Sequence, residues 1–172
     1  MALILMRHTR PVLSKAYCYG KSDIAVADTF ESDADDAMAN LPTFDRIVSS
    51  PLIRTRRLAD RIAQARKLDV TIDERIREMD FGRWEARLWS DIPRHELDAW
   101  AADFMDASPH GGEHVRAFQA RCRTAVQEWA ERDGDTLMVC HAGVVRAVFA
   151  NGDRSEDFSK SLDYGQTLRW PD

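Results

Sequence analysis

The chain has 172 residues, of which 44% are hydrophobic and 31% charged, a balance that suits a single globular domain over 1–172 and excludes long disordered tracts. Its formal net charge of −5 offers no basic surface, so neither nucleic acid nor an acidic membrane is expected as a partner. The apolar stretch 2–6 is too short for a signal peptide or a membrane anchor. Three cysteines without Cys-x-x-Cys spacing predict neither a disulfide framework nor a zinc site, and they favour a cytoplasmic location.

The first half of the chain alternates predicted strands and helices. The apolar run 2–6 predicts a buried strand, the acidic stretch 28–39 a surface helix, and Arg46–Ser49 a second strand. Pro51 suits the first turn of the next helix. Apolar residues follow it at three- and four-residue steps and should pack on a sheet: Leu52, Leu58, Ala59 and Ile62.

The second half continues the alternation. Val70–Ile72 predicts a third strand, and an aromatic, glycine-bearing loop of the kind that walls pockets follows at 79–85. Helical spacing then predicts two amphipathic helices, at 92–105 and 113–132, separated by the glycines near 111. Two further strands are predicted at 137–140 and at the end of 161–170. This order predicts a three-layer α/β/α sandwich with a mostly parallel central sheet.

Two histidines follow two of these apolar strands directly. His8 comes after the run 2–6 and Arg7, and His141 comes after the run 137–140. Ligands of open α/β sheets collect beyond the carboxyl ends of the strands, so both side chains should reach one crevice. The residues after His141 predict a helix start, which offers free backbone N–H groups to an anion at Gly143.

Four stretches in this order resemble the histidine phosphatase superfamily, the phosphoglycerate mutase-like proteins. They cover nearly the whole chain: Arg7-His8, the segment 49–54 that ends in Arg54, the segment 78–85 that begins with Glu78, and His141-Ala142-Gly143. Cys18-Tyr19-Gly20, the segment 75–85 and Gly111-Gly112-Glu113 resemble more narrowly the α-ribazole phosphatase branch. One departure is Thr9, which stands where the family commonly has glycine.

The resemblance implies a role for each matched residue, and phosphoryl transfer needs such roles. His8 would be the nucleophile that forms a phosphohistidine, Glu78 the general acid, and His141 a further donor. Arg7 and Arg54, together with His8 and His141, would bind the phosphate, since the reaction needs fixed positive charge around the phosphoryl oxygens. Because arginines neutralise the charge, we expect no metal and no cofactor.

Five further residues are candidates for contact with the rest of the substrate. Thr9 adds a hydroxyl beside the phosphate, Tyr19 and Trp84 could close over the pocket, and Gly143 opens the helix after His141. Glu113 sits where the family places a glutamate beside the pocket, although His114 replaces the serine that often follows. The alternative for Trp84 is a core position, and the alternative for Glu113 is a favourable acidic residue at a helix start.

The leading hypothesis is a metal-independent phosphatase for a small phosphate monoester, with α-ribazole 5′-phosphate of cobalamin biosynthesis as the substrate that the resemblance suggests. Three alternatives stay open: a phosphoglycerate mutase-type phosphotransferase, a protein phosphohistidine phosphatase, and a non-catalytic scaffold with the same fold. The oligomeric state is also open, with a homodimer as one option.

Overall fold

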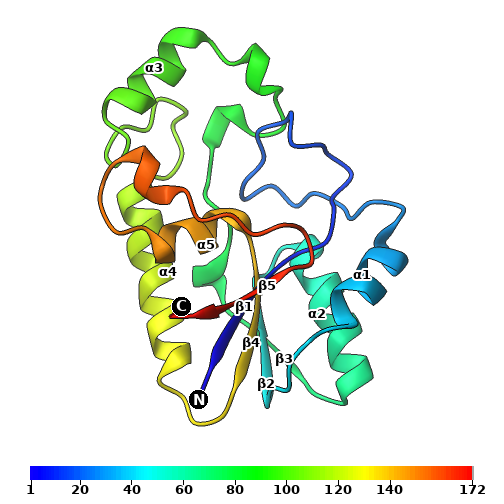
Figure 1. Ribbon diagram of the computed structural model, residues 1–172. Coiled ribbons are helices and arrows are strands. Elements are labelled where there is room, and N and C mark those ends of the chain that lie inside the picture. Colours follow the sequence, from blue (N-terminus) through cyan, green and yellow to red (C-terminus); the bar gives the residue numbers. More distant parts are fainter. Residues whose placement is uncertain (172) are drawn as a thin grey trace.

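A five-stranded sheet forms the centre of the computed structural model, which describes residues 1–171 (Figure 1). The strands lie in the order β3-β2-β4-β1-β5. Four of them are parallel, and β5 pairs antiparallel with β1 at one edge. Their bounds are Leu3–Arg7 for β1, Arg46–Ser49 for β2, Val70–Ile72 for β3, Thr136–Cys140 for β4 and Thr167–Trp170 for β5.

The middle strands carry unbroken apolar runs, 3–6 in β1 and 137–140 in β4, because helices cover both faces of the sheet. Successive side chains of a strand point to opposite faces, so Leu3 and Leu5 enter one core while Ile4 and Met6 enter the other. In the same way Met138 of β4 joins the first core. Each core is therefore built from alternate residues of the same strands.

Two pairs of helices form the outer layers. Helices α1 (Phe30–Met38) and α2 (Ile53–Arg66) pack on one face, and α4 (Val115–Ala130) and α5 (Ala142–Phe149) pack on the other (Figure 1). This arrangement confirms the predicted three-layer sandwich with a mostly parallel sheet.

Between β3 and α4 the chain leaves the sandwich and lies beyond the carboxyl ends of the parallel strands (Figure 1). This excursion holds three short 3₁₀ turns and helix α3: Glu74–Ile76, Gly82–Trp84, Trp89–Asp91 and Arg94–Ala102. It shares a small apolar core with the loop after β1, formed by Cys18 of that loop and by Trp84 and Ile92. A fourth 3₁₀ turn, Ser155–Phe158, follows α5.

The main differences from the predicted elements lie at their ends. Helix α2 begins at Ile53 because Leu52 is still extended, so Pro51 precedes the helix. Helix α3 is shorter than the predicted 92–105, since Pro93 caps its start and the chain leaves the helix at Asp103. Of the predicted segment 161–170 only the last four residues form a strand. The part before it passes over the ends of β1, with Gly165 N–H donating to the carbonyl oxygens of Arg7 and His8.

Candidate active site

Two histidines meet where neighbouring strands end. Strands β1 and β4 pair in parallel with Arg7 opposite Cys140, so the next residues, His8 and His141, leave the sheet side by side. Their ring centroids lie 5.3 Å apart with 60° between the ring planes, and both side chains are buried. The register of the sheet thus brings together the two residues that the sequence placed at strand ends.

A backbone contact fixes the proton of His8. Its Nδ1 lies 2.6 Å from the carbonyl oxygen of Thr9, which can only accept, so Nδ1 carries the proton and Nε2 keeps its lone pair. The pKa of His8 lies well below its usual value of 6.5. Burial lowers it most and the charges of Arg54 and Arg7 lower it further, while the Thr9 carbonyl acts in the opposite direction. His8 is therefore a neutral imidazole with one unprotonated nitrogen available for attack.

His141 is held in the same neutral state. Its Nε2 lies 2.7 Å from Oγ of Ser50, at the end of β2. Its Nδ1 is buried and has no hydrogen-bond partner among residues 1–171. Burial first, and then the charges of Arg54 and His8, keep the pKa of His141 well below 6.5.

Two cations converge on the ring of Tyr164. The Arg7 guanidinium carbon lies 3.9 Å from the ring centroid and Nζ of Lys15 lies 5.3 Å from it. The ring of His8 is 5.6 Å from the same centroid. Arg7 also donates to the carbonyl oxygen of Leu162 at 2.9 Å. Neither cation forms an ion pair within the described part of the chain, so positive charge gathers beside the nucleophile.

Arg54 is a fully buried cation. Its Nη1 and Nη2 donate to the carbonyl oxygens of Ser22 at 2.8 Å and Gly20 at 2.6 Å, while its Nε is without a partner among residues 1–171. Burial lowers its pKa, an effect only partly offset by Glu78 and other distant acidic groups. No carboxylate of the described chain forms an ion pair with it. A buried guanidinium without a counter-ion favours an anion nearby.

The carboxylate of Glu78 is anchored opposite these cations. Its Oε2 accepts a hydrogen bond from the N–H of Gly143 at 3.0 Å, at the start of α5, and its Oε1 accepts one from Met79 N–H at 3.0 Å. A Cβ at position 143 would lie 2.1 Å from Oε1 of Glu78. A larger residue at this position would therefore push the carboxylate away from the start of the helix.

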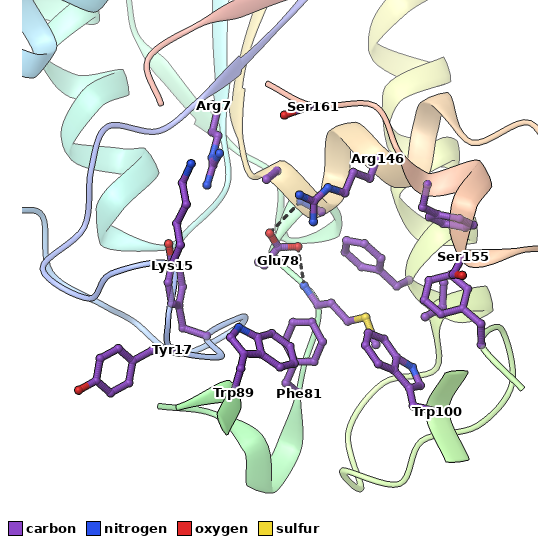
Figure 2. Close-up of a pocket in the computed structure, with 18 of the residues that line it drawn as sticks. Arg7, Lys15, Tyr17, Glu78, Phe81, Trp89, Trp100, Arg146, Ser155 and Ser161 are labelled. Carbon is purple, nitrogen blue, oxygen red and sulfur yellow. Dashed lines mark hydrogen bonds between the residues drawn. The ribbon is translucent and has the colours of Figure 1, made fainter. Parts of the chain in front are cut away.

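A cavity of about 440 Å³ opens between these groups, and its two ends differ in chemistry. Figure 2 shows Arg7 and Lys15 on one side of Glu78, with Trp100 and Ser155 on the other. The rest of the wall comes largely from apolar and aromatic side chains of the excursion, α4 and the turn after α5: Met79, Phe81, Trp89, Trp100, Phe104, Val115, Phe118 and Phe158. The cavity suits a ligand with an anionic group at one end and a flat apolar group at the other.

A sequence model of the histidine phosphatase superfamily (branch 1) matches residues 3–158. The chain belongs to this superfamily. The adenosylcobalamin/alpha-ribazole phosphatase of Escherichia coli (strain K12) is 31% identical over 113 residues, which are 63% of this chain and 56% of that protein. The glucosyl-3-phosphoglycerate phosphatase of Mycobacterium tuberculosis is 35% identical over 118 residues, which are 60% of this chain and 52% of that protein. The matched part thus spans little more than half the length of these relatives.

The fold agrees with this membership. The crystal structure of the alpha-ribazole phosphatase from Shigella flexneri aligns with a TM-score of 0.83 at 25% identity, covering 98% of this chain and 89% of that one. The two histidines, the two arginines and the glutamate predicted from the sequence lie in or beside one cavity. Arg7, His8 and Glu78 line the cavity, whereas Arg54 and His141 are fully buried beside it.

Of the other predicted substrate contacts, two lie on the cavity wall. Gly143 lines it beside Glu78, and Tyr19 lines it with its hydroxyl 3.0 Å from that of Tyr164. Tyr19 also lies below Arg54, whose guanidinium carbon is 5.4 Å from its ring centroid.

The other three predicted contacts do not line this cavity. Thr9 is buried and faces a separate hollow, so its carbonyl rather than its hydroxyl serves the site. Trp84 is completely buried, with Nε1 donating to Glu96 at 2.6 Å, because it forms the core of the excursion. Glu113 pairs with Arg121 at 2.7 Å in a shallow hollow behind Glu78, so it does not reach the cavity.

Four residues at the site are absent from the sequence prediction. Lys15, Tyr164 and Arg146 lie in or beside the cavity, and Ser50 contacts His141. Ser50 could have been found, since it follows β2 as the histidines follow β1 and β4. Arg146 could also have been found, because it lies one helical turn after Ala142 on the helix that opens at the site. Lys15 and Tyr164 come from loops, and no spacing in the sequence indicates their approach.

No group of three metal-ligating side chains that could hold an ion occurs among the residues that the structure describes. Likewise, none of the helices within 1–171 is long and apolar enough to cross a membrane.

Proposed function

We propose that this protein is a phosphatase that hydrolyses a small-molecule phosphate monoester through a phosphohistidine on His8. One observation carries the proposal: a buried, neutral imidazole with a free Nε2 lies between unpaired cations and an anchored carboxylate. Arg7, Lys15 and the buried charge of Arg54 supply the positive field that a phosphate dianion requires, and His141 is the remaining donor at this end.

In the first step Nε2 of His8 attacks phosphorus, and the bond between phosphorus and the ester oxygen breaks. Glu78 gives its proton to the departing oxygen, so the products are an alcohol and a phosphohistidine. In the second step Glu78 accepts a proton from water, whose oxygen attacks phosphorus. The P–N bond breaks, inorganic phosphate forms, and His8 returns to its starting state.

We propose α-ribazole 5′-phosphate, a cobalamin precursor, as the substrate. Two observations support this assignment. One of the curated relatives carries that activity in its name, and the aromatic end of the cavity suits a flat heteroaromatic ring. The free and buried thiols of Cys18, Cys122 and Cys140 suit a reducing compartment, so the proposal places the enzyme in the cytoplasm.

The test is to trap the intermediate. A brief reaction with ³²P-labelled substrate should leave an acid-labile, alkali-stable label on the wild-type protein and none on His8→Ala, whose turnover should be abolished. His95→Ala is the matched control because His95 is exposed on α3, and it should label like the wild type. EDTA should leave the rate unchanged. Turnover retained by His8→Ala, or a rate lost to EDTA and restored by a divalent ion, contradicts the mechanism.

A substrate panel separates the remaining alternatives. Faster release of phosphate from α-ribazole 5′-phosphate than from glucosyl-3-phosphoglycerate or a phosphohistidine peptide supports the substrate assignment. Transfer of the phosphoryl group to an added alcohol in preference to water indicates a mutase-type enzyme. Binding of phosphate without any turnover indicates a scaffold.

A further inference from the structure

The backbone that carries Glu78 lacks regular structure. It lies between two 3₁₀ turns, after Ile76 and before Gly82, and joins no strand. Within residues 1–171 the carbonyl oxygens of Arg77 and Glu78 accept no backbone hydrogen bond. A general acid has to be held to within a fraction of an ångström, so something outside this segment has to fix it.

Arg121 of α4 makes these missing contacts. Its Nη1 donates to the carbonyl oxygens of Arg75 at 2.7 Å and Arg77 at 2.8 Å, and its Nη2 donates to that of Glu78 at 3.3 Å. The two remaining N–H groups pair with the carboxylate of Glu113, from Nε at 2.7 Å and from Nη2 at 2.9 Å. All five donors of the guanidinium are thus used, in a position where only a quarter of the side chain is exposed.

Glu113 is tied to the same segment from the other side. Its N–H donates to the carbonyl oxygen of Asp80 at 2.9 Å, and the N–H of Asp80 points back to Oε2 of Glu113 at 3.5 Å. The Glu113–Arg121 pair therefore holds the backbone on both sides of Glu78. The tip of Glu78 meets Gly143 of α5, so two helices fix one side chain at its two ends.

We propose that Arg121, oriented by Glu113, is a positioning residue that sets the reach of the Glu78 carboxylate toward the leaving oxygen of the substrate. This inference rests on the proposed phosphatase function and assigns a role to two residues that do not line the cavity. A lysine at position 121 could not replace the arginine, because a single ammonium group cannot span three carbonyl oxygens and both oxygens of a carboxylate.

The role predicts a dependence on the leaving group. A nitrophenolate departs without a proton, so kcat/KM for p-nitrophenyl phosphate, which reports formation of the phosphohistidine, does not need Glu78. An alkoxide needs the proton. Arg121→Lys and Glu113→Gln should therefore lower kcat/KM for an alkyl phosphate about a hundredfold and leave that for p-nitrophenyl phosphate nearly unchanged. Glu78→Gln should show the same pattern, and adding Arg121→Lys to it should cost little more.

Arg116→Lys is the matched control. Arg116 also lies on α4, and it also donates two hydrogen bonds to one carboxylate, that of Asp106, at 2.8 Å each. It does not contact the segment around Glu78. It should turn over both substrates like the wild type. An equal loss on both substrates in Arg121→Lys, or no loss on either, overturns the proposal.

A second measurement does not require turnover. The N–H of Gly143 is bonded to Glu78, so its hydrogen-exchange rate by NMR reports where the carboxylate lies. Faster exchange at Gly143 in Arg121→Lys, with the other amides of α5 unchanged, supports the positioning role even if no substrate is turned over. Unchanged exchange at Gly143 refutes it. Failure of the phosphatase proposal is a separate result, namely a wild-type protein that hydrolyses neither ester.

Discussion

The two ends of the cavity are built in different ways. At the phosphoryl end, His8 and His141 directly follow the last residues of two paired strands. His8 donates to the carbonyl oxygen of Thr9 and accepts from the N–H of Gly165 through its own carbonyl, and His141 bonds to Oγ of Ser50. At the aromatic end, the rings of Phe81, Trp89 and Trp100 come from an excursion without a strand, where they pack edge to face at centroid distances of about 6 Å. In the proposed function, the sheet therefore positions the groups that react with the phosphate, while the excursion lines the space for the rest of the substrate.

Replacing Arg7 should give the largest effect, and it should be the same for every substrate. A lysine at this position loses the forked donor pair and the stacking on Tyr164, so kcat/KM should fall roughly a hundred- to a thousandfold. Steady-state kinetics on an aryl and an alkyl phosphate measures this loss. Arg10→Lys is the control, because Arg10 follows on the same loop but pairs with Asp33 at the surface. A loss confined to one substrate class argues against the division between the two ends.

Acid should lower the stability of the folded protein through its two buried active-site histidines. Burial and the charge of Arg54 lower the pKa of His8 and His141 in the folded protein, whereas the unfolded chain takes up their protons near the usual value of 6.5. The unfolded state thus binds more protons below this value, and the free energy of unfolding falls as the pH drops, by at most about 1.4 kcal/mol per pH unit for each histidine.

Urea denaturation at a neutral and at a mildly acidic pH tests this sign, with His8→Asn expected to reduce the difference. The same lowered pKa places the acidic limb of kcat/KM well below pH 6.5. An acidic limb at or above 6.5 shows that His8 is not kept neutral by its surroundings.

Trimming the aromatic end should give the smallest effect, and it should be selective. Trp100→Leu removes one ring from the cavity wall, which should raise KM about tenfold, or about 1.4 kcal/mol, for a phosphate ester with a flat heteroaromatic group. KM for a small alkyl phosphate should not change. The ratio between the two substrates is the measurement, because a general loss of folded protein cancels in it. An equal rise in KM for both substrates would show that the leaving group does not bind at the aromatic end of the cavity.

The sequence was sufficient for the parts of the site that regular structure positions. His8 and His141 could be placed because a parallel sheet aligns its carboxyl ends, and the apolar runs before them are long enough to identify the strands. The same periodicity predicted the layers of helices, with errors of two or three residues at the ends of α2, α3 and α4.

Sequence patterns were not sufficient where packing within the excursion decides the direction of a side chain. Trp84 and Trp100 are two tryptophans of the same segment, yet Trp84 is buried in the core and Trp100 lines the cavity. Glu113 lies close to Glu78 in space but points to the far side of its backbone, toward Arg121. Such differences depend on contacts between loops that are distant in the sequence, which no local periodicity encodes.

The contacts made by residues 162–165 have a consequence for shortened forms of this chain. Leu162, Tyr164 and Gly165 hold Arg7 and His8 from outside the 3–158 region that the superfamily profile recognises. A fragment that stops at residue 158 still contains every residue of the four sequence motifs: Arg7, His8, Arg54, Glu78 and His141. From its motifs alone it would therefore not be distinguished from the longer chain. It lacks the contacts of residues 162–165 with Arg7 and His8 and the edge strand β5 beside β1, so we expect it to hold the nucleophile poorly and to lose the proposed activity.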